Sequence, residues 1–180
     1  MTLGTLEFEP VRDRVDLLAQ PTAAAVAALS KTEGVGVAAI DPSLSDTAGF
    51  CEHYKIGPEL AANCVIVEGK RGEERTLAAV IILASTRADV NGAVRTALGA
   101  KKVSFAQMEK AVAESGMEHG AITPVGLPAT WPIFIDGAVV KTPYVIIGSG
   151  IRGSKLAVPG SFLATLPNAT VIEGLAQPRV

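Results

Sequence analysis

Apolar and polar residues recur with two different periods along this chain, and each period predicts a kind of secondary structure. Apolar positions at helical spacing, next to capping residues, predict helices over residues 22–30, 46–54, 89–98 and 104–115. Short apolar, mostly β-branched runs bounded by glycine, proline or charged residues predict strands. These runs cover residues 35–40, 64–67, 76–83, 133–135, 144–147, 155–158 and 170–172, with a short helix expected over 159–166.

Several residues mark the ends of these elements. Asp46 is expected to cap the second helix, and Gly99 to end the third, which begins at Asp89. Ser104 and Gln107 have the spacing of a capping box and predict the start of the fourth helix.

The strand predicted at residues 76–83 contains seven consecutive apolar residues, from Leu77 to Leu83. Such a run is typical of a central strand covered on both faces. The charged segment 69–74 before it predicts a β-hairpin, or two adjacent strands, with residues 64–67. Strands in the middle and end of the chain, with helices between them, predict a mixed α/β (α+β) fold. We expect a curved, barrel-like mixed β-sheet surrounded by helices.

Length and composition narrow the class of protein. The 180 residues are most simply one domain, residues 1–180, in which residues 1–20 form a solvated lead-in. Hydrophobic residues make up 48% of the chain, but aromatic residues only 4%, so Ala, Val, Ile and Leu must fill the core. We expect no membrane segment and no export signal, and therefore a cytoplasmic protein.

Charge is distributed unevenly along the chain. Residues 1–90 contain 8 Lys and Arg against 13 Asp and Glu, whereas residues 91–160 contain 7 against 4. The second half is thus mildly basic, which is far from the basic stripe of a protein that grips a long nucleic acid. It is compatible with binding the end of one, or with a random scatter of surface charge.

Two glycine-rich loops and one acid in residues 120–153 are the candidate site. Asp136 and the loop Gly148-Ser149-Gly150 each follow a predicted strand, where small-molecule sites are commonly built. The run from Gly148 to Gly153 matches G-x-G-x-x-G, but only 27 residues follow it and residues 155–158 look extended. A dinucleotide-binding half needs more chain and a helix at that point. We therefore interpret the run as a loop that approaches a ligand.

Other kinds of chemistry have little support in the residues. Ser149, His119 and Asp136 could be drawn as a hydrolytic triad, but the serine lacks a G-x-S-x-G elbow. Two histidines and few clustered carboxylates make a metal site improbable, and we expect no cofactor. Cys64 is more typical of a small core residue than of a nucleophile, and with Cys51 it forms no C-x-x-C pair.

Three segments together resemble the YbaK / prolyl-tRNA editing-domain family of aminoacyl-tRNA deacylases. They are Gly120-Ala121-Ile122-Thr123-Pro124-Val125-Gly126-Leu127, Ile135-Asp136, and Gly148-Ser149-Gly150-Ile151-Arg152-Gly153. The resemblance covers roughly residues 60–166. It implies a mixed α/β fold and hydrolysis, in trans, of the ester that joins a wrong amino acid to the terminal adenosine of a tRNA. It also implies the tRNA acceptor end as partner, an aminoacyl-tRNA synthetase as a second candidate partner, and a monomer or weak dimer.

The resemblance also implies roles for individual residues. Asp136 would be the pocket acid, and Gly148, Ser149 and Gly150 the backbone cradle for the ester and its attacking water. The alternative for Asp136 is a turn residue before Gly137. The remaining residues would contact substrate: Asn63, His119, Gly120, Thr123, Pro124, Gly126 and Arg152.

One position departs from the family pattern. The family usually carries a lysine at the start of the first core strand, where this chain has Asn63. Asparagine offers hydrogen bonds but no charge. The chain is then a member of a divergent subgroup, or its reaction is weak or lost; the alternative is that Lys55 or Arg152 reaches in instead. The leading hypothesis is a trans-acting deacylase of mischarged tRNA. A second is a non-catalytic member that binds a nucleotide, an aminoacyl-nucleotide or a protein partner, and a third is an NAD-dependent enzyme.

Overall fold

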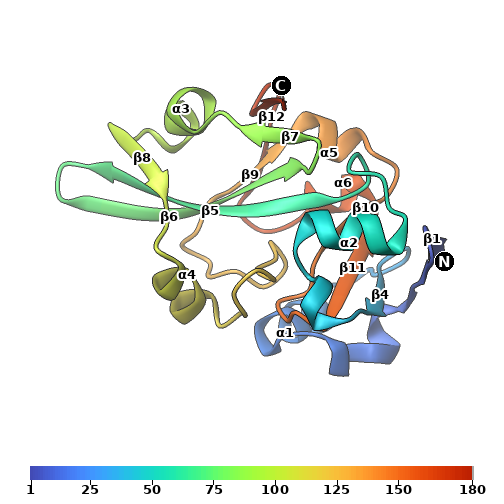
Figure 1. Cartoon of the computed structure of the whole chain (residues 1–180). Coiled ribbons are helices and arrows are strands. Elements are labelled where there is room, and N and C mark those ends of the chain that lie inside the picture. The colour runs from blue at the N-terminus through green and yellow to red at the C-terminus, as the bar shows by residue number, and fades with distance from the viewer. Residues whose placement is uncertain (180) are drawn as a thin grey trace.

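A five-stranded mixed sheet forms one half of the fold (Figure 1). The computed structural model describes residues 1–179. The strand order is β12-β9-β6-β5-β8, in which β5 pairs antiparallel with β6 and β8, whereas β9 runs parallel to β6 and β12. The bounds are β5 Ala62–Arg71, β6 Glu74–Leu83, β8 Lys102–Phe105, β9 Ile133–Asp136 and β12 Ala169–Ile172.

A four-stranded antiparallel sheet forms the other half, in the order β10-β11-β4-β3. Its strands are β3 Glu9–Pro10, β4 Gly36–Ala39, β10 Val145–Gly148 and β11 Ser154–Val158. The two sheets meet at one bridge, Ala61 to Ile146, where the Ile146 amide donates to the carbonyl oxygen of Leu60 at 2.7 Å. The mixed α/β fold is confirmed, but the sheets separate beyond this bridge and do not close into a barrel.

Short strands and helices surround the sheets. Two small antiparallel pairs are β1 Thr2–Leu3 with β2 Leu6–Glu7, and β7 Thr86–Ala88 with β13 Ala176–Pro178. The helices are η1 Val11–Leu17, α1 Gln20–Ala28, η2 Pro42–Leu44, α2 Thr47–Tyr54, η3 Val90–Val94, α3 Arg95–Leu98, α4 Met108–Ser115, α5 Gly137–Lys141 and α6 Gly160–Leu163.

The helix ends follow the capping residues predicted from the sequence. The Asp46 carboxylate accepts from the Gly49 amide at 3.0 Å, and that of Asp89 accepts from the amides of Gly92 and Ala93. Gly99 ends α3 with φ of +63°, a conformation that glycine adopts without strain. These three predictions are confirmed. Their signals are local, so tertiary packing does not override them.

The predicted capping box is wrong. Ser104 lies in β8, whose residues pair with Val67–Lys70 of β5, and α4 begins only at Met108. Pairing with the hairpin satisfies the backbone of residues 102–105, which a helix start at Ser104 would have left to the side chains alone. The β5–β6 hairpin itself is confirmed, and it is longer than the apolar runs that predicted it.

The core consists mainly of small aliphatic side chains on both faces of β6. Residues 77–82 are all buried, as expected of a central strand. Leu77, Ala79 and Ile81 pack into one apolar cluster, whereas Ala78, Val80 and Ile82 pack into another on the opposite face. This rigid centre fixes β5, and β5 positions the site described next.

Candidate active site

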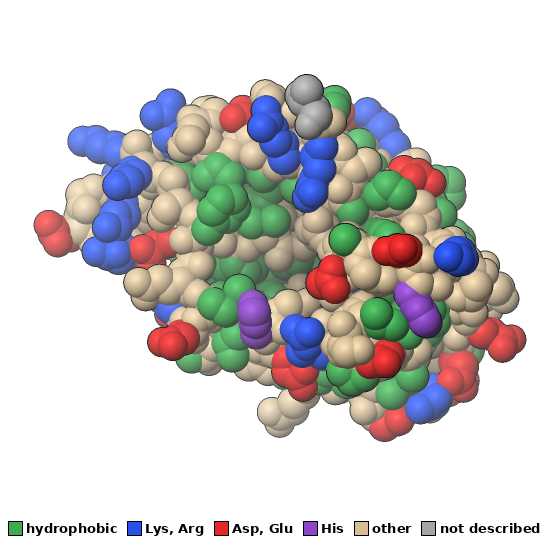
Figure 2. Space-filling view, in the orientation of Figure 1, with side chains coloured by type: hydrophobic (Ala, Val, Ile, Leu, Met, Phe, Trp, Pro, Cys, Tyr) green, Lys and Arg blue, Asp and Glu red, His purple; other side chains and the backbone are tan. Residues whose placement is uncertain are grey.

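A cavity of about 510 Å³ lies along an edge of β5 that β8 leaves unpaired. β8 pairs only with Val67–Lys70, and the Ala106 amide donates to the Ile66 carbonyl oxygen, so residues 62–65 of β5 are left without a strand partner on that edge in the part of the chain that the structure describes. Figure 2 shows this part of the surface hollowed, with hydrophobic side chains around the depression. The lining comes from residues 45–47, Phe50, residues 61–66, residues 105, 106, 108 and 111, Gly120, Ile122, Ile146, Gly148 and Lys155.

The two glycine-rich loops predicted to form the site do lie side by side. The Gly150 amide donates to the carbonyl oxygen of Ala121 at 2.8 Å, and the Gly150 carbonyl accepts from the Glu118 amide at 2.8 Å. A Cβ atom on Gly148 would lie only 2.6 Å from the carbonyl oxygen of Ala121. Glycine is therefore required at residue 148 for the loops to approach this closely.

The backbone of Gly148 is oriented toward the cavity. Successive amides in a strand point to opposite edges, so the Gly148 amide points to the same edge as that of Ile146. The Ile146 amide bonds to Leu60 at the start of β5, and beyond that bond the two strands separate around the cavity. The Gly148 N–H is thus a donor directed into the gap between the sheets.

Lys155 brings a positive charge into this cavity. It lies directly opposite Gly148 in the β10–β11 ladder. Its Nζ atom donates to the carbonyl oxygen of Ser45 at 3.0 Å and lies 5.1 Å from the centre of the Phe50 ring. Burial lowers the pKa of Lys155 from its ordinary value, while the nearby Cys51 and Asp46 oppose that shift. The ammonium is therefore partly stripped of water, which strengthens its interaction with any anionic group that enters.

Two further polar groups lie at the same wall. Ser45 is 2% exposed, and within residues 1–179 its hydroxyl has no hydrogen-bond partner. A buried polar group without a partner is costly, and this hydroxyl belongs to the cavity lining. Asn63 accepts a 2.7 Å hydrogen bond from the Thr47 hydroxyl through its Oδ1 atom. Asn63 belongs to the cavity lining, and its side-chain NH2 group is a neutral donor.

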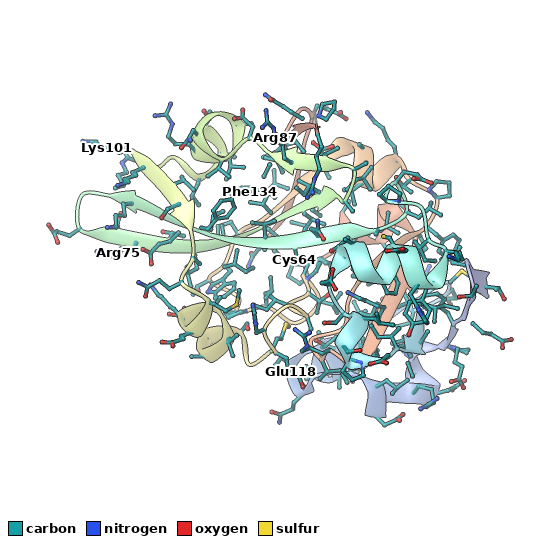
Figure 3. All side chains as sticks on the ribbon, in the orientation of Figure 1. Cys64, Arg75, Arg87, Lys101, Glu118 and Phe134 are labelled. Atoms are coloured by element: carbon teal, nitrogen blue, oxygen red, sulfur yellow. The ribbon has the colours of Figure 1, made fainter. Side chains whose placement is uncertain are left out.

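The cysteine in the lining is not a nucleophile. Burial raises the pKa of Cys64 to about 12, so the thiol stays protonated at neutral pH, whereas the thiolate is the reactive form. Figure 3 shows Cys64 on β5, near the junction with the second sheet.

Three of the residues predicted for the site line this cavity: Asn63, Gly120 and Gly148. Two more, His119 and Arg152, are outside the lining but in contact with each other. The Arg152 guanidinium donates to the carbonyl oxygens of His119 and Pro42, both at 3.3 Å, and the His119 side chain is exposed. Arg152 thereby joins the residue before Gly120 to the start of η2.

The other loop residues lie behind the cavity wall. The Ser149 hydroxyl is fully buried and bonds with the Ser154 hydroxyl at 2.6 Å, and Gly126, with φ of +98°, packs against Pro21. Ser149, Gly150, Thr123, Pro124 and Gly126 are absent from the lining among the described residues. Their contacts support the loops rather than reach into the cavity.

Asp136 lies away from the lining and has a complete set of partners. Its carboxylate accepts from the Ala138 amide and the Ala176 amide, each at 2.8 Å, and so caps α5 and holds the chain before β13. This geometry matches the alternative interpretation of Asp136 as a turn residue before Gly137.

Sequence reasoning missed Lys155 and Ser45. The signal for Lys155 was present: a single lysine interrupts the apolar strand Ser154–Val158 directly after the second glycine loop. Its position opposite Gly148 depends on strand register, which the sequence did not reveal. Ser45 lies in a loop before α2 and gave no comparable signal.

Two further findings concern metal clusters and membrane spans. Within the described part of the chain, no three His, Cys, Asp or Glu side chains gather as a metal ion would require. None of the helices in residues 1–179 is both long and apolar enough to cross a bilayer.

Comparison with known proteins shows the family and the fold. The family model described as the aminoacyl-tRNA editing domain matches residues 41–166. The fold is similar to a proposed trans-editing enzyme for prolyl tRNA synthetase, with a TM-score of 0.69 and 18% identity over 86% of this chain and 96% of that one. It is also similar to a protein described as hypothetical, with a TM-score of 0.65 and 20% identity over 74% of this chain and 85% of that one.

The search of curated proteins gives no significant match. The family model, however, spans more than half of the chain and contains both glycine loops, Asn63 and Lys155. The chain therefore belongs to the aminoacyl-tRNA editing-domain family.

Proposed function

We propose that this protein hydrolyses, in trans, the ester bond between a wrongly attached amino acid and the terminal adenosine of a tRNA. Membership of the editing-domain family supports this reaction class. The observation that carries the proposal for this chain is the pairing of Lys155 with Gly148 across the cavity wall. It sets a partly desolvated cation beside a backbone donor in a space lined by apolar groups.

The reaction requires little of the protein beyond positioning and charge stabilisation. Water attacks the ester carbonyl carbon, and the carbonyl oxygen becomes an oxyanion in the tetrahedral intermediate. The bond to the ribose oxygen then breaks, and that oxygen takes up the proton released by the water. Backbone donors and cations aimed at the developing oxyanion accelerate such steps. In this cavity the Gly148 N–H and the Lys155 ammonium are the groups suited to that task.

Asn63 is where the family resemblance expects a lysine, and Lys155 offers a replacement for the missing charge. In our proposal, Lys155 supplies from β11 the ammonium that other members supply from the first core strand. Asn63 then orients substrate through its amide nitrogen, while its oxygen remains bound to Thr47. The unpartnered Ser45 hydroxyl, next to Lys155, is placed to bond a polar group of the bound amino acid or ribose.

The test is release of the amino acid from a panel of mischarged tRNAs, measured for the wild type, Lys155→Met and Lys141→Met. Lys141 is the matched control because its ammonium pairs with the exposed Glu173, outside the cavity lining. We expect release by the wild type and by the control, and a large loss with Lys155→Met. Folded wild-type protein that releases no amino acid from any mischarged tRNA contradicts the proposal.

The second candidate is a member of the family that binds its ligand without cutting it. Its support is the neutral Asn63, held by Thr47 in the place of a charged residue. Binding of aminoacyl-tRNA without release, followed by a gain of release in Asn63→Lys, would favour this candidate. Restored release there would also show that Lys155 does not replace the missing charge.

A further inference from the structure

Three cations face one another in a row across the end of the mixed sheet. Lys70 of β5 lies directly opposite Lys102 of β8 and, on its other side, directly opposite Arg75 of β6. Directly opposite residues share one face of a sheet, with Cβ atoms about 4.5–5.5 Å apart, and like charges in such pairs are destabilising. The protein therefore maintains an unfavourable arrangement at this end of the sheet.

A groove of about 560 Å³ runs over this row, which we call the cation groove. Besides the three cations, its lining includes Lys110 of α4 and one acid, Glu68, so four positive charges face a single negative one. Glu68 bonds to Arg75 at 3.0 Å and to Lys110 at 2.6 Å. Figure 2 shows Lys and Arg side chains gathered at the end of the molecule where Figure 1 places the β5–β6 hairpin and β8.

Lys70 and Lys102 keep their charges uncompensated within the described chain. No carboxylate of residues 1–179 lies within ion-pair distance of either ammonium. Glu68 offsets only one of the two charges of Arg75 and Lys110, so with the unpaired Lys70 and Lys102 the groove has a net positive charge. An external anion with more than one charge would remove the repulsion.

The cation groove adjoins the cavity that holds Lys155. Phe105, at the end of β8, belongs to the lining of both. It is 68% exposed, although large apolar side chains are usually covered, and Met108 beside it at the start of α4 is 45% exposed. An exposed aromatic ring between a basic groove and a cavity is the arrangement with which proteins hold single-stranded nucleic acid, the bases stacking on the ring and the phosphates meeting the cations.

We propose that the cation groove binds the phosphates at the acceptor end of a tRNA, and that Phe105 stacks on a base as the strand passes into the cavity. This assignment rests on the proposed function, because it takes the ligand of the cavity to be the aminoacyl-adenosine at the tip of the same strand. An RNA fits better than an acidic protein because phosphates alone would account for the cations, whereas the bases also account for the exposed Phe105.

The test separates docking from hydrolysis by measuring each with its own probe. Binding is followed by fluorescence anisotropy with deacylated tRNA at several salt concentrations, and hydrolysis with mischarged tRNA and with an aminoacyl ester of adenosine, which has no phosphate. The variants are Lys70→Glu/Lys102→Glu and Phe105→Ala. Arg87→Glu is the matched control, an exposed cation on β7 that Figure 3 shows apart from Arg75 and Lys101.

We expect the double variant to weaken tRNA binding by at least tenfold and to reduce the slope of log affinity against log salt by about 1.4–1.8, since each lost phosphate contact removes about 0.7–0.9. Phe105→Ala should weaken binding at least about fivefold with little change in the salt slope. Both should raise KM for mischarged tRNA. The double variant, whose two lysines lie outside the cavity lining, should leave hydrolysis of the adenosine ester unchanged. Arg87→Glu should resemble the wild type.

Unchanged affinity in the double variant, or equal losses in Arg87→Glu, would overturn the assignment. So would competition by polyglutamate as effective as that by tRNA, because an acidic polypeptide would then satisfy the groove equally well. If the wild type binds tRNA through the groove but hydrolyses no ester, the proposed function fails and the docking surface stands. Lys70→Gln and Lys102→Gln, which cannot add a charge, repeat the binding test should the double reversal disturb folding.

Discussion

The Nζ atom of Lys155 donates a hydrogen bond of 3.0 Å to the backbone carbonyl oxygen of Ser45. That bond crosses from β11 to the loop before α2 and fixes the ammonium above the Phe50 ring. One proton of the ammonium is used in this way, and the others remain for a group inside the cavity. A single residue thus joins the two walls and supplies the cavity with its charge.

Replacement of Lys155 by methionine should remove activity without removing stability. The volume is nearly kept and a desolvated charge is lost, so the unfolding free energy should stay the same or rise. If the ammonium stabilises the oxyanion, kcat should fall about 10²–10³-fold, as for loss of one oxyanion donor. Steady-state deacylation and urea unfolding measure the two effects. A fall in stability with unchanged kcat would contradict the assigned role.

The pH dependence of stability should reveal the buried ammonium. The folded-state pKa of Lys155 is lowered below 10.5, so between that lowered value and 10.5 the unfolded chain holds more protons than the folded one. The unfolding free energy should therefore gain a favourable contribution as pH rises through this window. The raised pKa values of Cys51 and Cys64 act in the opposite direction above pH 9.

Only the difference between the wild type and Lys155→Met isolates the lysine. Urea unfolding at a series of pH values should show the variant losing this rise. Deacylation, corrected for spontaneous ester hydrolysis, should decline as pH passes the lowered pKa of Lys155, earlier than an exposed lysine would allow. Identical pH profiles for the two proteins would contradict the prediction.

Gly148→Ala should damage the cavity through the backbone. The added Cβ would lie 2.6 Å from the Ala121 carbonyl oxygen, which itself accepts from the Gly150 amide. Relief requires the two loops to separate, which turns the Gly148 amide away from the cavity. We expect kcat/KM for deacylation to fall at least about 100-fold. Gly72→Ala is the control for a glycine substitution that causes no steric clash. A Cβ there would meet open space, so its only cost is the positive φ of residue 72, and activity should stay close to the wild type.

Asp136→Ala should act on stability and not on chemistry. It removes the cap of α5 and leaves the Ala176 amide without an acceptor, which together should cost about 2–4 kcal/mol. Guanidinium unfolding measures the loss, and kcat of the folded protein should be close to the wild type. A large fall in kcat in a stable variant would instead support the pocket role that the family resemblance implies for Asp136.

Lys102→Glu should make the protein more stable. It converts the like-charge pair with Lys70 into an opposite-charge pair across β5 and β8, worth about 0.2–1 kcal/mol. Thermal unfolding at low salt measures the gain, which should shrink at 1 M salt because surface charges are screened. Lys102→Gln should give about half the effect. A variant less stable than the wild type would show that the facing lysines do not destabilise the folded protein.

The sequence predicted those features that local chemistry determines. Asp46 and Asp89 cap the starts of helices and Gly99 ends one, each through contacts within a few residues. The length of the apolar run Leu77–Leu83 was enough to predict that the strand is buried. The meeting of the two glycine loops was expected from the family resemblance, although the first loop follows helix α4 and only the second follows a strand.

Features that depend on distant partners were not predicted. Ser104 and Gln107 carry a helix-start pattern, but pairing with residues 67–70 overrides it. The role of Asp136 is decided by the Ala176 amide, 40 residues away. Lys155 became a site residue only because β11 pairs with β10 in a register that sets it opposite Gly148. None of these three contacts can be detected in the local pattern of apolar and polar residues.

The single bridge between Ala61 and Ile146 has a structural cost as well as a use. If β5 and β10 stayed paired beyond this bridge, more backbone N–H and C=O groups would be hydrogen-bonded within the chain, and the melting temperature would be higher. The hollow would then vanish, and with it the room for an incoming ester. Selection for catalysis should therefore oppose selection for rigidity at the bridge between the two sheets. Substitutions there that raise thermal stability should lower turnover.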